Sequence, residues 1–122
     1  MKKIILFTLI SFVYISVHAQ VANSKWRGTL HLDSPREVIF NFKTDTLEAI
    51  SPEDNSVIEM MHYSIQDTVL TLQKISGQSE CDENTIGKYK FEMDNDGMHL
   101  TLIEDDCDDR SGVLDDTKWV KE

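Results

Sequence analysis

From residue 26 onward, apolar and polar side chains alternate along the chain in short runs. Residues 26–33, 38–43 and 87–94 show the alternation most regularly. A period of two is typical of β-strands that bury one face, because successive side chains of a strand point to opposite sides. We find no long run with the three-to-four-residue spacing of an amphipathic helix. The pattern therefore predicts an all-β protein.

Polar, turn-forming residues separate the predicted strands. The clearest hairpin turn is the tetrapeptide at residues 94–97, because its last residue, Gly97, can take the positive φ of a tight turn. The other breaks fall at residues 34–35, 44–45, 51–55, 66–67 and 76–85. Residues 105–114 have room for one short helical turn, and residues 117–121 form a last short strand.

About eight short strands with short connections predict a single antiparallel sheet. A meander of consecutive hairpins closes naturally into an up-and-down barrel, which leaves no unpaired edge. A two-sheet sandwich is the alternative, but it normally needs longer crossing connections. Only residues 76–85 are long enough for one. The sequence thus favours a single up-and-down antiparallel barrel of about eight strands, with a short helical turn before the last strand.

The inward face of this barrel is large and apolar. Its predicted members are Trp26, Leu30, Leu32, Phe40, Phe42, Met61, Tyr63, Leu70, Leu72, Tyr89, Phe91, Met93, Met98, Leu100 and Leu102. A barrel of this size is either filled by its own side chains or holds one small ligand. Short strands and bulky side chains favour a filled or nearly filled interior. If a ligand binds, we expect it to contact the side chains near mid-strand, namely Phe40, Phe42, Met61, Tyr63, Tyr89 and Phe91.

The first residues have a different pattern. Two lysines precede an apolar run over residues 4–17, and Ala19 ends the segment before an expected cleavage site. This is the three-part layout of a secretory signal peptide, and the run is shorter than the roughly 20 residues that span a bilayer. No cysteine follows that could carry a lipid anchor. We expect residues 1–19 to be removed, and residues 20–122 to form one exported domain in the periplasm or outside the cell.

The chain is strongly acidic. Its formal charge is −10, and loss of the two signal lysines makes it −12. Nucleic acid and anionic lipid both require clustered Lys and Arg, so neither is an expected partner. The acidity is typical of a soluble protein that repels its own copies, with an acidic binding surface as the alternative, and we expect a monomer that is not embedded in a membrane.

Cys81 and Cys107 are the two cysteines of the chain. Both fall in the exported part, where the oxidising environment favours a disulfide. Closing the loop between them stabilises the fold by about 3 kcal/mol in the chain-entropy model. We do not expect them to bind zinc, which takes four ligands, or to act as catalytic thiols.

Clustered carboxylates are the most conspicuous candidate for other chemistry. Residues 104–109 hold five of them around Cys107, and carboxylates can ligate Ca²⁺. The spacing lacks the glycine and the terminal glutamate of a calcium loop, which favours a solvated acidic loop. His31, His62 and His99 fall on three predicted strands without metal-ligand spacing. Without a nucleophile elbow or a phosphate-binding loop, we expect no catalytic residues, metal or cofactor.

A tryptophan near the start of the first strand and an arginine before the last strand form a further pattern. These residues are Trp26, within Ser24-Lys25-Trp26-Arg27-Gly28, and Arg110. With residues 87–91, 100–102 and 106–110 and Trp119, they make the chain resemble small secreted bacterial lipocalin-like domains. The glycine that usually stands two residues before the tryptophan is Ser24 here.

The resemblance implies a structural role for both residues. In that family the tryptophan lies at the closed end of the barrel and the arginine packs across it. A cation–π contact between Arg110 and Trp26 would be worth about 0.5–2 kcal/mol. The alternative is that Trp26 is ordinary core and that Arg110 pairs with Asp106 or Asp109.

The resemblance also implies a function without chemistry. A lipocalin-like protein would bind a small hydrophobic ligand inside the barrel. The alternative is a secreted protein-interaction module, such as a protease inhibitor, whose contacts would come from residues 20–25, 51–55 and 76–84. A third hypothesis is an envelope component that has no ligand.

Overall fold

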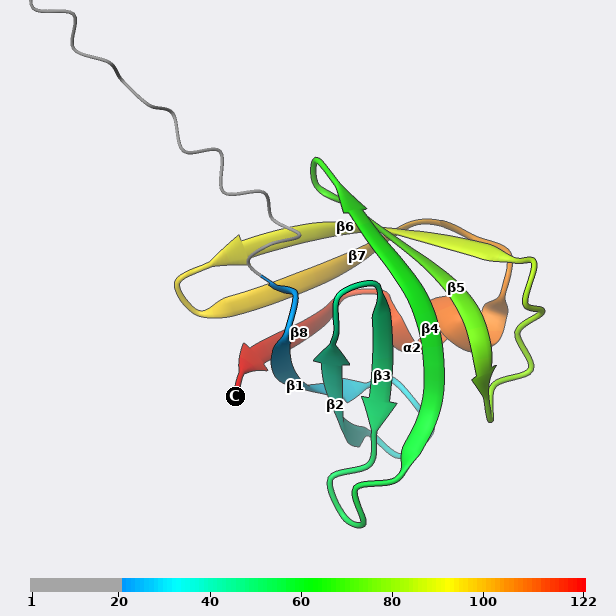
Figure 1. The fold of residues 1–122 in the computed structure, drawn as a ribbon, viewed down its shortest axis with the longest axis horizontal. Helices are drawn as coiled ribbons and strands as arrows, with labels where there is room; N and C mark the ends of the chain where they lie inside the picture. Colours follow the sequence, from blue (N-terminus) through cyan, green and yellow to red (C-terminus); the bar gives the residue numbers. More distant parts are fainter. Residues whose placement is uncertain (1–20) are drawn as a thin grey trace, which may run out of the picture.

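A computed structural model describes residues 21–122, so the predicted signal peptide lies outside the described residues. In the described part, eight antiparallel strands follow one another and close into a barrel (Figure 1). The strands are β1 (Ser24–Leu30), β2 (Arg36–Phe42), β3 (Thr46–Ile50), β4 (Val57–Gln66), β5 (Val69–Gly77), β6 (Ile86–Asp94), β7 (Gly97–Asp105) and β8 (Thr117–Lys121). A short helix, α2 (Asp108–Leu114), lies between β7 and β8. The predicted up-and-down barrel, with its helical turn before the last strand, is confirmed.

Each strand pairs with the next one along the chain, and β8 returns to β1. Three residue pairs make this closure: Trp26 opposite Lys121, Arg27 opposite Val120, and Gly28 opposite Trp119. Hairpin connections make the meander possible because consecutive antiparallel strands need only short turns. At residues 94–97, the turn has Gly97 at φ 142° and the Asp94 carboxylate accepting the backbone N–H groups of Asp96 and Gly97.

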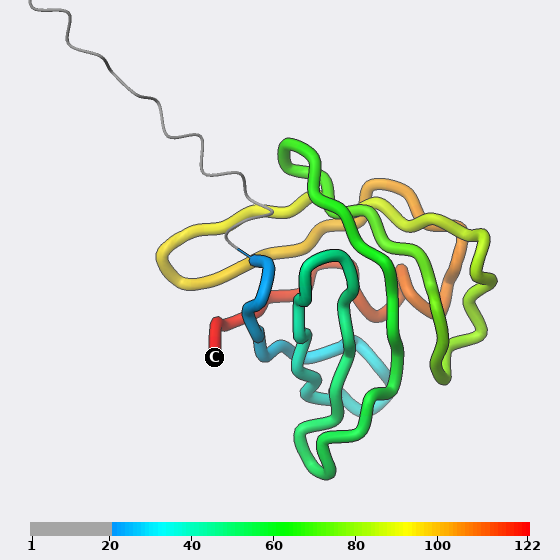
Figure 2. The backbone as a smooth tube through the Cα atoms, in the orientation of Figure 1, coloured from blue at the N-terminus to red at the C-terminus, as the bar shows by residue number. Residues whose placement is uncertain are grey.

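The alternating strand directions give the barrel two different ends. The turns at residues 43–45, 67–68 and 95–96 share one end, which we call the turn end. The longer loops at residues 31–35, 51–56 and 78–85 share the other end with α2, which we call the helical end. In the backbone tube, the hairpin tips of the turn end point away from α2 (Figure 2).

Aromatic side chains fill the turn end. Trp26, Phe42 and Tyr63 are buried there, and the rings of Phe42 and Tyr63 meet edge to face with centroids 5.1 Å apart. The Tyr63 hydroxyl donates a hydrogen bond to the Lys43 carbonyl oxygen at 2.5 Å. The hydroxyl of this buried side chain therefore has a hydrogen-bond partner at the barrel rim. The Trp26 indole N–H donates to the Ser24 hydroxyl at 2.9 Å.

A stacked pair crosses the middle of the barrel. The rings of Phe40 and Trp119 lie 4.0 Å apart at an interplanar angle of 17°, and both are almost fully buried. Trp119 packs directly over the backbone of Gly28 in the neighbouring strand. This pair forms the boundary between the filled turn end and the helical end.

Two residues of the predicted inward face lie outside it. Leu32 is 43% exposed and Met93 is 38% exposed. The prediction was wrong for both because alternation buries a side chain only while its strand is part of the barrel wall. Leu32 lies beyond the end of β1. Met93 lies where the β6–β7 hairpin extends past β5, which begins opposite Lys90.

The packing of Trp119 on Gly28 predicts a position-specific cost of adding one methyl group. A Cβ at residue 28 would lie 2.4 Å from Trp119 Cε3, and the Phe40 ring behind the indole limits its retreat. We expect Gly28→Ala to lower the free energy of unfolding by about 1–3 kcal/mol, measured by urea denaturation.

The matched control is Gly112→Ala in α2, where a Cβ meets nothing within 4 Å. There we expect a gain of about 0.5–1 kcal/mol, because alanine is the better helix former. Equal stability of the two variants would contradict this account of the core.

Candidate functional site

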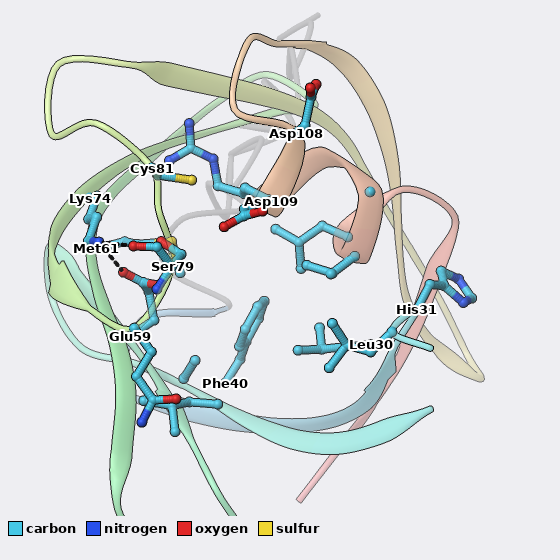
Figure 3. A pocket seen from close by; sticks show the side chains of 18 of the residues that line it. Leu30, His31, Phe40, Glu59, Met61, Lys74, Ser79, Cys81, Asp108 and Asp109 are labelled. Carbon is cyan, nitrogen blue, oxygen red and sulfur yellow. Dashed lines mark hydrogen bonds and ion pairs between the residues drawn. The ribbon is translucent and has the colours of Figure 1, made fainter. Parts of the chain in front are cut away.

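A cavity of about 660 Å³ opens at the helical end of the barrel. Small-molecule sites in proteins typically occupy roughly 300–1,000 Å³. The walls come from the barrel interior, from the loops at residues 31–35 and 78–85, and from α2 (Figure 3).

The floor and one side of the cavity are apolar. Phe40, Ala49 and Met61 supply buried barrel-wall surface, and the Phe40 ring extends into the space in Figure 3. Apolar side chains from the strand ends and from α2 complete this surface: Leu30, Ile58, Val113 and Leu114. The helix is held to the strand end by a hydrogen bond of 3.2 Å from the His31 N–H to the Val113 carbonyl oxygen.

A charged pair forms the opposite wall. The Lys74 ammonium lies 3.7 Å from Glu59 Oε1 and donates to the Ser79 carbonyl oxygen, while the other Glu59 oxygen accepts the Ser79 N–H at 3.0 Å. Lys74 follows Leu70 and Leu72 on the inward face of β5, so strand alternation itself places this cation inside the barrel mouth. The two charges neutralise each other, but among the described residues the buried Glu59 Oε1 atom has no hydrogen-bond partner.

A second ion pair fixes α2 to the barrel. Arg110 Nε donates to Asp105 Oδ2 at 2.6 Å, and Nη2 donates to Oδ1 at 2.9 Å and to the Thr85 carbonyl oxygen at 2.9 Å. The Tyr89 hydroxyl donates to the same Asp105 carboxylate at 2.5 Å. The Asp105 side chain is fully buried and that of Arg110 is 5% exposed. Such a two-point contact between guanidinium and carboxylate fixes geometry as well as charge.

The protonation states of this network follow from its contacts. Burial acts to raise the pKa of Asp105, but hydrogen bonds from Arg110 and Tyr89 outweigh it and hold that pKa below its usual value. Burial, together with the hydrogen bond to the Asp105 carboxylate, raises the pKa of Tyr89 far above its usual value. At neutral pH the network therefore consists of an arginine cation, a carboxylate and a neutral phenol.

The disulfide ties the helix to the neighbouring loop. Cys81 in the loop at residues 78–85 is bonded to Cys107, with Cα atoms 5.5 Å apart. Cys107 is also the N-cap residue of α2. Two residues further along the chain, the Asp109 carboxylate accepts the Glu80 N–H at 2.9 Å. The predicted disulfide is confirmed, and its place in the fold is the rim of the cavity.

The residues predicted to contact a ligand divide into two groups. Phe40 and Met61 line the cavity. The remaining four are buried in the barrel but are not part of the cavity lining: Phe42, Tyr63, Tyr89 and Phe91. Sequence reasoning missed the contributions of Ile58, Lys74 and α2. The sequence offered one sign of this lining: Lys74 continues the every-second-residue pattern of the inward-facing Leu70 and Leu72.

Trp26 and Arg110 are not brought together. Trp26 lies near the start of β1 at the turn end, whereas α2 contacts the end of that strand, about 13 Å further along. Trp26 is core, and Arg110 pairs with a nearby carboxylate. That carboxylate belongs to Asp105 rather than to Asp106 or Asp109, because Asp105 is the one that is buried beside Gly87.

Asp105 of the acidic cluster, and the histidines His31 and His99, make local contacts in the described part of the chain. Asp105 is engaged by Arg110, and Asp116 Oδ1 lies 2.6 Å from His99 Nε2. The His31 ring nitrogen Nε2 lies 3.1 Å from the Asp116 carbonyl oxygen. Within residues 21–122, no group of three or more His, Cys, Asp or Glu side chains could hold a metal ion.

Comparison with known protein families, curated proteins and solved structures gives no match for this chain. Within residues 21–122, no helix has the length and apolar character to cross a membrane. The site is therefore interpreted from its own geometry.

The buried ion pair predicts acid sensitivity. Because the pKa of Asp105 is lower in the folded state, its contribution to stability is fully present above the unfolded-state pKa of about 3.9 and is lost as pH falls through the folded value. We expect Asp105→Asn to lower the free energy of unfolding by about 3–5 kcal/mol at neutral pH, because it leaves the arginine charge buried without its partner.

Denaturation curves at several pH values test this expectation. The gap between the wild-type protein and Asp105→Asn is expected to shrink below pH about 4. The neighbouring exposed Asp106→Asn variant is the control, and it should stay close to wild type. A gap that does not change with pH would contradict the assigned ion pair.

Proposed function

We propose that this chain is a non-enzymatic, lipocalin-like binding protein that holds one small, mainly apolar molecule in the cavity beneath α2. The observation that carries the proposal is a cavity of about 660 Å³ whose floor is buried apolar barrel wall. Removing apolar ligand surface from water is favourable by roughly 25 cal/mol per Å², so a cavity of this kind can bind without specific polar contacts.

The arrangement of the two barrel ends supports entry from one side. The turn end is filled by aromatic rings, and the stacked Phe40–Trp119 pair lies beneath the cavity. A ligand would enter from the helical end and rest against Phe40.

The charged groups of the walls support binding rather than catalysis. Lys74 is held by Glu59 and the Ser79 carbonyl, and Arg110 is held by Asp105. Both cations neutralise a carboxylate of the protein itself, so their role in the fold is structural. The disulfide is compatible with an oxidising compartment, and export with loss of residues 1–19 is part of the proposal.

The interaction-module alternative receives less support from the fold. It requires residues 20–25, 51–55 and 76–84 to contact one partner. The described part of the first segment leads into the start of β1 at the turn end, whereas the other two lie at the helical end. Segments at opposite ends of a barrel do not form a single contact surface.

Filling the cavity with protein atoms tests the proposal. We expect saturable binding of the neutral fluorescent dye Nile red to the wild-type protein, with one molecule bound per chain. Ala49→Phe places a ring inside the cavity and should weaken the affinity at least about tenfold, or about 1.4 kcal/mol. Val113→Trp, from the partly buried face of α2, narrows the same space with less change to the barrel wall.

Ser64→Phe is the control, because it adds the same ring on the exposed face of β4. It should bind the dye as the wild-type protein does. The proposal fails if the folded wild-type protein binds no dye, or if all three variants bind it equally well.

A further inference from the structure

We infer that the ligand of this cavity is a cationic amphiphile: an apolar chain or ring system with an ammonium or similar positive group at one end. The inference rests on the proposed function and adds the chemical class of the ligand. It follows from which charges around the cavity are compensated within the protein and which are not.

The two cationic side chains of the cavity lining, Lys74 and Arg110, are already bound to groups of the protein itself. The Lys74 ammonium is shared between Glu59 and the Ser79 carbonyl oxygen, and its side chain is only 11% exposed. Arg110 donates hydrogen bonds from Nε and Nη2 to the Asp105 carboxylate, and from Nη2 to the Thr85 carbonyl oxygen. Its remaining nitrogen, Nη1, has no hydrogen-bond partner within residues 21–122 but is covered by protein atoms, so a ligand cannot reach it. An anionic head group would find no available partner among these two side chains.

The mouth carries carboxylates instead. Asp33, Asp108 and Asp109 line the cavity and are exposed, and none of them forms an ion pair within residues 21–122. Figure 3 shows the Asp109 carboxylate directed toward the cavity and that of Asp108 directed away from it. Among the described residues, Asp109 uses only Oδ2, which accepts the Glu80 N–H, so Oδ1 remains available to a ligand.

The position of Asp109 completes a two-part site. The apolar floor at Phe40 and Met61 lies inside the barrel, and the uncompensated carboxylate lies on the first turn of α2 at the rim. A molecule with its apolar part on the floor would place its other end beside Asp109. Attraction between opposite charges at this rim favours a cationic end, and the acidic surface of the whole protein acts in the same direction.

Three ligands with the same tail and different head groups test this inference. Decylammonium, decanol and decanoate are titrated by calorimetry into the protein comprising residues 20–122. The pH is 8, where a free histidine is neutral. We expect decylammonium to bind at least about tenfold more tightly than decanoate, with decanol between them. Added salt should reduce this preference, because it screens charges near the surface.

A charge-neutral variant of the rim is the second arm. Asp109→Asn should weaken decylammonium binding severalfold and leave decanol binding unchanged. Asp33→Asn provides an independent variant of the same rim. Asp96→Asn is the matched control, because it removes one exposed carboxylate at the turn end, far from the cavity.

The outcomes separate the inference from the function on which it rests. Equal binding of the three ligands, or tighter binding of decanoate, overturns the cationic class and leaves the cavity as an apolar binding site. Binding of none of them by a folded protein overturns the proposed function and the inference together.

Discussion

The buried ion pair between Arg110 and Asp105 is the interaction on which the helical end of this protein depends. It joins α2 to the last residue of β7, and through the Thr85 carbonyl and the Tyr89 hydroxyl it reaches the start of β6. The disulfide adds a covalent link from the helix N-cap to the loop at residues 78–85. With this position fixed, α2 forms one wall of a cavity instead of collapsing into the barrel mouth.

The interior of the barrel is divided by the size of its side chains. Phe42, Tyr63 and Trp26 close the turn end, whereas the corresponding inward position near the helical end of β3 is Ala49. Small and charged side chains, Ala49 and Lys74 among them, leave the space that large apolar ones would occupy. A filled end and an open end therefore coexist in one short barrel. The filled interior expected from the sequence describes the turn end, and the alternative of an open interior describes the helical end.

The regular parts of this fold could be predicted from the sequence because alternation within a barrel wall is a local property. The strands, the turn at Gly97 and the helical turn all follow from short segments, and the disulfide follows from a chain with two cysteines. The partner of Arg110 could not be predicted, because the choice among neighbouring aspartates depends on which one β7 buries. The cavity lining was predicted only at Phe40 and Met61, since the position of α2 over the barrel mouth is set by long-range contacts.

Proton exchange at the Arg110 guanidinium, followed by ¹⁵N NMR, tests the central ion pair most directly. We expect a resolved Nε–H signal that exchanges slowly with water at neutral pH, with a nuclear Overhauser contact to Tyr89, because this group is buried and bonded to a carboxylate. Fast exchange, like that of a free arginine side chain, would show that the guanidinium is in solvent. In that case α2 is not held as described, and the cavity has no fixed wall.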